Sequence, residues 1–245
     1  MKQDRVVFTS VFNEDDLLPI WLSYYSRFFT NIVVIDHIST GDSIRKAQKK
    51  FKFDLIYDNN VVITQLDGRA IDSTVDRLAM MQYQKGFLQD YKWVLYAHAD
   101  EFVVAHPKKF SGLDEYIDKC KKDYVFCIGR SVLHFPAKEK PLDFTKPLLK
   151  QRTYWWNDNH SSHKPLLSRV PLDWVNGYHS LGGITDEQKR DSMFHAYDDL
   201  YMIHLVQADL NLYQRRGRHS VSLSWFNKGK DDKSVEKIPE EFKIF

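Results

Sequence analysis

The sequence has no long apolar run and very few cysteines. No stretch of its 245 residues approaches the roughly 18 consecutive apolar residues of a membrane-spanning helix, and residues 1–5 lead straight into a short strand pattern. Cys120 and Cys127 are the only cysteines, too few for a disulfide framework. We therefore expect free thiols, no signal peptide, no integral membrane segment and a cytoplasmic protein.

An excess of charge of one sign is also missing. The chain has 35 Lys and Arg against 33 Asp and Glu, a net charge of +2, which argues against a nucleic acid partner. A hydrophobic content of 43% and an aromatic content of 14% supply enough apolar surface for a sizeable core. The length suits one large α/β domain, and we find no internal repeat.

Strand and helix patterns alternate along the first half of the chain. Apolar runs at 5–10, 32–35, 61–64 and 93–96 favour strands. Helical spacing of apolar residues begins near 17 and near 44, and it continues over 71–90. This alternation predicts an α/β fold with a mostly parallel central sheet flanked by helices.

The second half is less regular. The pattern favours helices over 113–120 and 208–216, and strands at 124–128, 164–170, 173–175 and 201–206. Residues 226–245 mix five lysines with five acids without a period. We expect one domain over 1–225 and a charged C-terminal tail over 226–245.

Polar residues stand at the predicted strand ends of the first half: Asn13, Glu14, Asp36, Asp67, Arg69, His98 and Asp100. The carboxyl ends of parallel strands share one edge of a sheet, where α/β proteins bind ligands. A carboxylate such as Asp36 can accept hydrogen bonds from a ribose or a base. His98 and Asp100, two apart in an extended chain, can point to one side and hold a divalent cation, which would neutralise a diphosphate.

Three segments carry a resemblance to a known family: FNEDDLLPIWL at 12–22, IDHISTGDS at 35–43 and AHADEF at 97–102. In this order and spacing they resemble the opening loop, the second-strand turn and the Asp-x-Asp-Glu-Phe metal motif of family 2-like glycosyltransferases of GT-A fold. Segments 203–209 and 215–219 are also similar to that family.

The resemblance implies a GT-A-type nucleotide-sugar-binding domain. It would act as a hexosyltransferase that moves a sugar from a nucleotide-sugar donor to a saccharide or glycoconjugate acceptor, in polysaccharide biosynthesis, with Mn²⁺ or Mg²⁺. Residues 1–104 would bind the donor and 105–225 the acceptor. Asn13, Glu14 and Asp36 would contact the nucleotide.

The resemblance also suggests the metal ligands. Asp100 would bind the cation, and His98 stands where the family usually has Asp. Histidine can ligate Mn²⁺ or hydrogen-bond a ribose, but it removes one negative charge from a site for a hard cation. His179 or His204 would add a further ligand, although a histidine beside an apolar strand can equally be structural.

The remaining candidates lie in the second half. Asp186 and Glu187, in a polar loop, are candidates for the base that deprotonates the acceptor. Arg215 could meet the donor diphosphate or belong to a solvated basic patch. Trp155 and Trp156 could stack on an acceptor sugar or pack in the core.

Two other functions fit part of the pattern. A nucleotide-sugar-binding domain without catalysis would account for His98 in place of Asp. His98, Asp100 and His204 also match the spacing of a two-histidine, one-carboxylate iron site of an oxygenase, but that chemistry normally sits in an all-β barrel.

Overall fold

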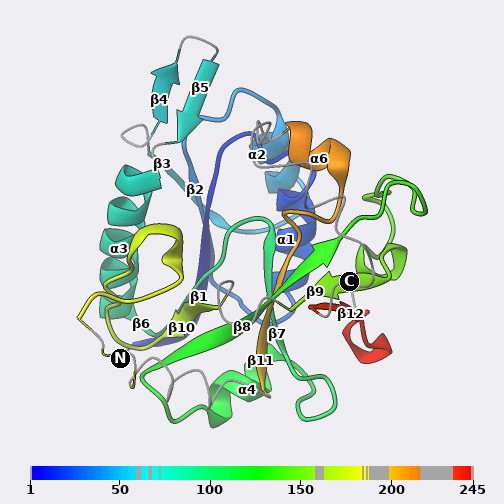
Figure 1. The fold of residues 1–245 in the computed structure, drawn as a ribbon. Coiled ribbons are helices and arrows are strands. Elements are labelled where there is room, and N and C mark those ends of the chain that lie inside the picture. The colour runs from blue at the N-terminus through cyan, green and yellow to red at the C-terminus, as the bar shows by residue number, and fades with distance from the viewer. Residues whose placement is uncertain are drawn as a thin grey trace.

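The computed structural model describes residues 2–58, 62–65, 68–71, 73–157, 163–183, 185, 187, 199–215 and 234–243. These residues form an α/β structure in which helices flank a central sheet, as predicted (Figure 1). The sheet strands are β1 (Gln3–Val11), β2 (Ile32–Asp36), β3 (Asp54–Tyr57), β6 (Tyr91–Tyr96), β7 (Glu101–Ala105), β8 (Tyr124–Leu133), β9 (Tyr154–Trp156), β10 (Lys164–Ser168), β11 (Leu200–His204) and β12 (Val235–Lys237). The helices are α1 (Leu18–Tyr25), α2 (Ser43–Gln48), α3 (Ser73–Asp90), α4 (Leu113–Lys119) and α6 (Leu210–Arg215), with short 3₁₀ turns η1 (Leu149–Gln151), η2 (Asn176–Tyr178) and η3 (Glu240–Phe242).

The sheet has ten strands in the order β12-β9-β8-β10-β6-β1-β2-β3, and β11 lies between β7 and β8. Strands β6, β1, β2 and β3 are parallel, which is the part that the alternating pattern predicts. From β10 onward the pairing is mainly antiparallel, with β11 parallel to β8. The N-terminal half therefore builds the parallel part of the sheet, and the C-terminal half completes it by longer-range pairing.

Side chains of the parallel strands alternate between two cores because successive residues of a strand face opposite sides of a sheet. Val7 and Leu95 pack with Trp21 of α1 in one core. Val6, Val94 and other residues of these strands pack with Met80 of α3 in the other. Figure 1 shows α3 on one side of these strands and α1 and α2 on the other.

The strand predicted at 61–64 does not belong to the central sheet. Residues of β4 (Val62–Gln65) pair with β5 (Gly68–Ile71) in a separate two-stranded hairpin, and β3 instead extends the sheet beside β2. The sequence pattern does not reveal β3, because this edge strand has only two half-buried residues between two exposed ones. The prediction that Asp67 and Arg69 lie at the edge of the central sheet assumed that the strand at 61–64 belongs to that sheet, and this assumption does not hold.

The buried face of α3 is only partly apolar. Its buried residues are Asp76, Met80, Gln84 and Leu88, spaced four apart, whereas Val75 is 38% exposed. Gln84 donates to Ser168 Oγ and accepts from the Leu172 backbone N–H, so polar groups are hydrogen-bonded on the inner face. The positions of apolar residues alone therefore do not identify the buried face of α3, because exposed Val75 and Leu78 are apolar and buried Asp76 and Gln84 are polar.

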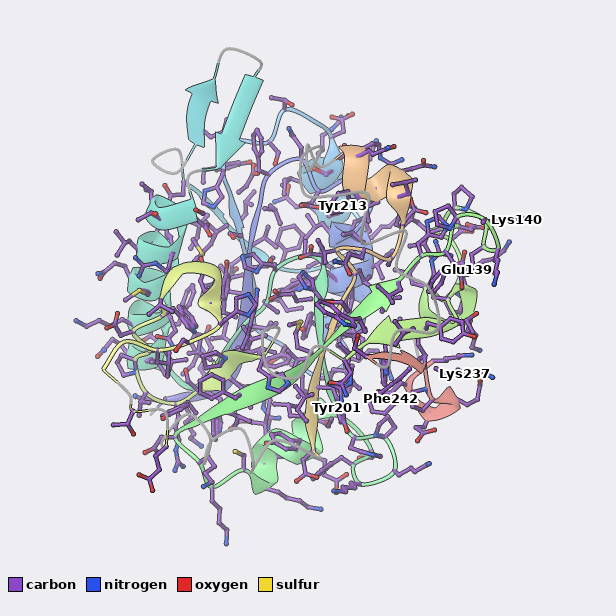
Figure 2. All side chains as sticks on the ribbon, viewed as in Figure 1. Glu139, Lys140, Tyr201, Tyr213, Lys237 and Phe242 are labelled. Carbon is purple, nitrogen blue, oxygen red and sulfur yellow. The ribbon has the colours of Figure 1, made fainter. Side chains whose placement is uncertain are left out.

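Part of the predicted charged tail packs on the body of the protein. β12 pairs with β9, and Ile238 and Phe242 are buried. Figure 2 shows Phe242 beside Tyr201, and their ring centroids are 4.8 Å apart. Alternating charges and isolated apolar residues hid this short docked segment.

Two smaller expectations concern cysteines and membrane spans. Cys120 and Cys127 are both free thiols, as predicted. None of the described helices is both long enough and apolar enough to cross a bilayer.

Candidate functional site

The carboxyl ends of three parallel strands form one edge of the sheet. The register pairs Val11 of β1 with Asp36 of β2, and Phe8 of β1 with Tyr96 of β6. The turns that follow these strands therefore begin at the same edge. This is the edge at which the sequence placed Asn13, Asp36 and the 97–102 motif.

Asp36 organises the turn after β2. Its Oδ1 accepts hydrogen bonds from the Ser39 backbone N–H at 3.0 Å and from the Ser39 hydroxyl at 2.5 Å. The side-chain Oδ1 of Asn13 accepts a hydrogen bond from the Thr40 backbone N–H at 2.8 Å, and the Asn13 backbone N–H donates to Ser39 Oγ at 2.9 Å. Asn13 and Ile38 hold this arrangement with positive φ angles of 56° and 57°. The structure thus joins Asn13 and Asp36 in one compact turn.

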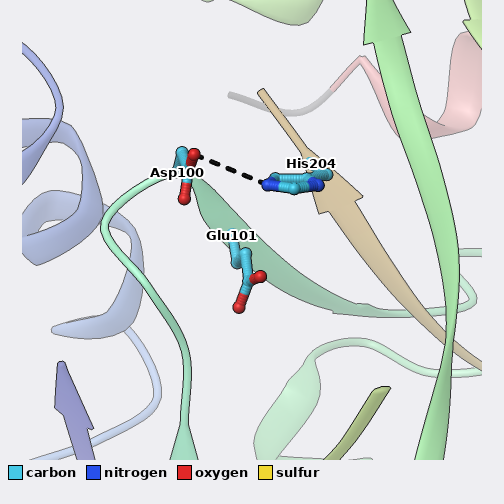
Figure 3. Close-up of side chains that lie close together, drawn as sticks. All are labelled: Asp100, Glu101 and His204. Carbon is cyan, nitrogen blue, oxygen red and sulfur yellow. Dashed lines mark ion pairs between the residues drawn. The ribbon is translucent and has the colours of Figure 1, made fainter. Parts of the chain in front are cut away.

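A carboxylate and an imidazole face each other where β7 meets β11. Asp100 lies in the turn before β7, and His204 ends β11, which pairs antiparallel with β7. His204 Nε2 lies 3.5 Å from Asp100 Oδ2, and Asp100 is only 2% exposed (Figure 3). With Glu101 they form a group whose possible ligand atoms all lie within 4.8 Å of one another.

Glu101 is already compensated by a cation of the protein. Its Oε1 accepts a hydrogen bond from Lys164 Nζ at 2.6 Å, and its Oε2 accepts one from the His98 backbone N–H at 3.1 Å. Burial alone would raise the pKa of the Glu101 carboxyl, but Lys164 and then His98 hold it well below its ordinary value. Glu101 is therefore an ionised, internally paired group.

His98 is not part of the close group of Asp100, Glu101 and His204. Its Nε2 lies 3.0 Å from the Tyr96 hydroxyl, and its Nδ1 lies 3.3 Å from Glu101 Oε2. The Tyr96 hydroxyl in turn lies 3.0 Å from Ser10 Oγ on β1. The chain turns at 99–100 rather than remaining extended, so the side-by-side placement expected for residues two apart does not occur.

His179 follows the η2 turn and lies near the same charges. Burial, followed by the positive charge of Lys164, lowers the pKa of His179 to about 4, so the ring is neutral at pH 7. Its Nδ1 is buried and has no hydrogen-bond partner among the described residues. A neutral imidazole has the protonation state that metal binding requires, but His179 is not in the close group of Asp100, Glu101 and His204.

The structure describes only some of the other predicted site residues. Asp67 and Asp186 lie outside the described residues, as does the side chain of Arg69. Glu187 is exposed. Arg215, at the end of α6, pairs with Asp16 at 2.5 Å.

Sequence reasoning missed a second buried chain of polar groups beside the site. His37 Nε2 lies 3.2 Å from Asp76 Oδ1, and the Tyr178 hydroxyl donates to Asp76 Oδ2 at 2.7 Å. Tyr178 has a φ of 62° and packs against His98, with ring centroids 5.1 Å apart. The only sequence feature that could have indicated these groups is Asp76, an acid within the predicted helix over 71–90.

The residues present fit a divalent cation in part. Asp100 and His204 offer a carboxylate oxygen and an imidazole nitrogen from two paired strands, a donor set that suits Mn²⁺ better than the oxygen-rich preference of Mg²⁺. Glu101 is committed to Lys164, so it contributes little further negative charge. Asp100 and His204 are the side chains that would hold the ion.

The comparisons with known proteins are sparse. No protein-family model matches the sequence, and no curated protein does. Among solved structures, the chain is similar to the crystal structure of residues 1–349 of TarS from S. aureus in complex with UDP, with a TM-score of 0.34 and 13% identity. The match covers 62% of this chain and 40% of the TarS chain. A likeness at this level assigns neither a family nor an activity to the chain.

Proposed function

We propose that the protein is a glycosyltransferase that moves a sugar from a nucleotide-sugar donor to a saccharide or glycoconjugate acceptor. The observation that supports it most is the pair of buried Asp100 and half-buried His204, 3.5 Å apart, at the sheet edge that also carries the Asp36 turn. The Asp100–His204 pair is suited to a cation bound to a diphosphate, and the Asp36 turn is suited to a nucleoside. Together they offer contacts for both parts of a nucleoside diphosphate.

The Asp36 turn would bind the nucleoside. Both hydrogen bonds to the Asp36 carboxylate from Ser39 end on Oδ1, which fixes the orientation of the carboxylate within the turn. A carboxylate fixed in this way can accept hydrogen bonds from ribose hydroxyls without further ordering, so less entropy is lost on binding. Asn13, in the turn after β1, supports the same turn by accepting a hydrogen bond from the Thr40 N–H.

Asp100 and His204 would act on the diphosphate. A divalent cation held by Asp100 and His204 would supply positive charge that stabilises the departing nucleoside diphosphate. The chain contributes a buried setting in which such charge is effective, because electrostatic interactions are stronger in a medium of low dielectric constant. Lys164 and Glu101 neutralise each other beside the pair, which keeps the local charge low.

The acceptor base remains a proposal from the sequence. Asp186 and Glu187 stand in a polar stretch of the sequence, and the exposed position of Glu187 is compatible with contact to a large acceptor. We likewise retain polysaccharide biosynthesis and a cytoplasmic location as proposals.

A binding domain without catalysis is the second candidate function. The observation in its favour is that His98, at the position of the usual first acid, is engaged with Tyr96 and Glu101. Release of free sugar or of nucleoside diphosphate from a bound donor separates the two, since only the enzyme produces it. We do not propose the iron oxygenase, because the described strands form a mixed sheet flanked by helices.

A thermal-shift panel of nucleotide sugars, each with Mn²⁺ and with a chelator, tests the proposal. A donor that binds the folded state raises the melting temperature, and at about 100 times its Kd it adds roughly 2.7 kcal/mol. Asp36→Ala should abolish most of the shift. Asp90→Ala, which removes an exposed acid at the opposite edge of the sheet, should retain it. No shift with any nucleotide sugar would contradict the proposed function.

A further inference from the structure

A dense group of cations lies on α2 and the segment that follows it. The group, here called the basic segment, consists of Arg45, Lys46, Lys49, Lys50 and Lys52. All five are exposed, and no acid lies between them in the chain. Removing these five from the 35 basic residues leaves 30 against 33 acids. The remainder of the protein is therefore slightly acidic, and the positive charge is local.

Local packing presents these cations outward. Helix α2 buries Ser43, Ile44 and Ala47 and leaves its cations in solvent. Beyond the helix, Phe51 and Phe53 are half-buried and pack against the core, while the intervening Lys52 is exposed. The phenylalanines hold the segment on the body of the protein, so the lysines form a fixed surface.

The stability of the helix does not account for so many cations. Cations near a helix C-terminus interact favourably with the helix dipole, and Arg45 also pairs with Asp42 at 2.9 Å. However, Arg45 and the C-cap residue Lys49 are four residues apart, a spacing at which like charges on a helix repel one another. Lys52 lies beyond the helix altogether. Such repulsion is relieved when an anionic surface approaches from outside.

Three cations of the basic segment, Lys49, Lys50 and Lys52, lie away from the candidate site. The parallel register pairs Val33 with Asp54, so residues 49–53 enter β3 at the amino ends of the strands. Asp36 lies at the opposite, carboxyl edge. Residues 48–53 also line a shallow depression that is open to solvent.

We propose that the basic segment docks the protein on a bilayer surface rich in anionic phospholipid. A cluster of about four to eight exposed cations is the recognised signature of such a surface. Single-stranded nucleic acid is normally bound by cations together with exposed aromatic rings, but Phe51 and Phe53 pack inward here. Docking through Lys49, Lys50 and Lys52 would leave the edge with Asp36 and Asp100 uncovered, so we expect donor binding to continue on the membrane.

Vesicle co-sedimentation tests the proposal directly. The wild-type protein should bind vesicles with about one third phosphatidylglycerol at low ionic strength, and it should be released at about 0.5 M salt. It should not bind vesicles of phosphatidylcholine alone. The triple variant Lys49→Glu, Lys50→Glu and Lys52→Glu should lose about 100-fold in vesicle partition, since each cation contributes roughly a fivefold factor.

The matched control is the triple variant Lys121→Glu, Lys122→Glu and Lys138→Glu. It changes three exposed lysines elsewhere and shifts the net charge by the same amount, so it should bind vesicles nearly as well as the wild type. Equal melting temperatures of the two variants verify that both are folded. The proposal is overturned by no wild-type binding to anionic vesicles or by equal loss in both variants. Retention by a short DNA duplex in place of vesicles would overturn it in favour of nucleic acid.

Discussion

Individual residues at the candidate site are held mainly by other charged and aromatic side chains. Lys164 compensates Glu101 at 2.6 Å and lies 5.8 Å from the centre of the Tyr178 ring. Breaking such a buried ion pair by removing one partner commonly destabilises a protein by about 3–5 kcal/mol. Lys164 and Glu101 are thus a structural support on which the position of His98 depends.

A first prediction concerns His98→Asp, the change that restores the usual acid of the family motif. In this structure the new carboxylate would face Glu101 Oε2, now 3.3 Å from the His98 ring. We expect a loss of roughly 1–3 kcal/mol in the free energy of unfolding and no gain in donor turnover. Urea unfolding beside His98→Asn, which adds no charge, checks this. A His98→Asp protein that is as stable as the wild type and more active would show that position 98 accepts a ligand carboxylate.

A second prediction concerns pH and the His37–Asp76 pair. Burial alone would lower the pKa of His37, but the hydrogen bond with Asp76 raises it above 6.5. Burial alone would raise the pKa of Asp76, but the hydrogen bond with His37 lowers it below 3.8. The contribution of His37 is complete below 6.5 and is lost as pH rises through its raised pKa. That of Asp76 is present above 3.8 and is lost as pH falls through its lowered pKa.

The pair therefore stabilises the protein most between these two ordinary values. The deficit of Asp76→Asn relative to the wild type should be largest near about pH 5 and smaller near about pH 8. Unfolding free energies measured at both pH values provide the comparison. A deficit that does not vary with pH would mean that the pair does not carry charge in the folded state.

At the scale of secondary structure, the C-terminal segment closes one side of the sheet. Phe242 is 3% exposed and packs against Trp155 and Tyr201, with ring centroids 5.2 Å and 4.8 Å away. β12 completes the arrangement by pairing with β9. The segment thus belongs to the folded domain in its structural role.

A third prediction follows for Phe242→Ala. Removing a buried phenylalanine should lower the free energy of unfolding by about 3 kcal/mol. Glu240→Ala, in the same 3₁₀ turn but exposed, should change it by less than about 0.5 kcal/mol. Thermal unfolding of the three proteins measures the difference. Equal stability of both variants would mean that the docked segment adds no stability.

Elements with strong local signals could be predicted from the sequence, and elements that depend on partners could not. The sequence predicts β2 because four of its five residues are Ile or Val. This apolar run suits a central strand, and all five residues are buried in the structure. The edge strand β3 lacks such a run, and the hairpin strand β4 has one that resembles a sheet strand. The inner face of α3 carries Asp76 and Gln84, whose burial depends on hydrogen bonds to distant residues.

At the scale of the whole molecule, the two halves differ in how they assemble. The parallel strands form around local strand–helix–strand units, which periodicity detects. The Asp100–His204 pair requires β11 to lie between β7 and β8, a pairing between segments far apart in the chain. The sequence pattern suggests Asp100 and His204 separately as site residues. It could not predict that Glu101 pairs with Lys164, or that His98 contacts Tyr96 and Glu101.

The most direct test of the proposed activity is the effect of Asp100→Asn on turnover of the nucleotide sugar that stabilises the protein most. Removing the anionic ligand while keeping its size should lower kcat by about 10²–10³. The protein should remain folded, because asparagine keeps the size of the side chain and one of its two oxygens, and the melting temperature is measured beside turnover to verify this. The assay is run with Mn²⁺ and with a chelator, beside Asp90→Asn as a control. We expect loss of turnover in Asp100→Asn and in the chelated wild type alone. Wild-type turnover by Asp100→Asn in a folded protein would contradict the account.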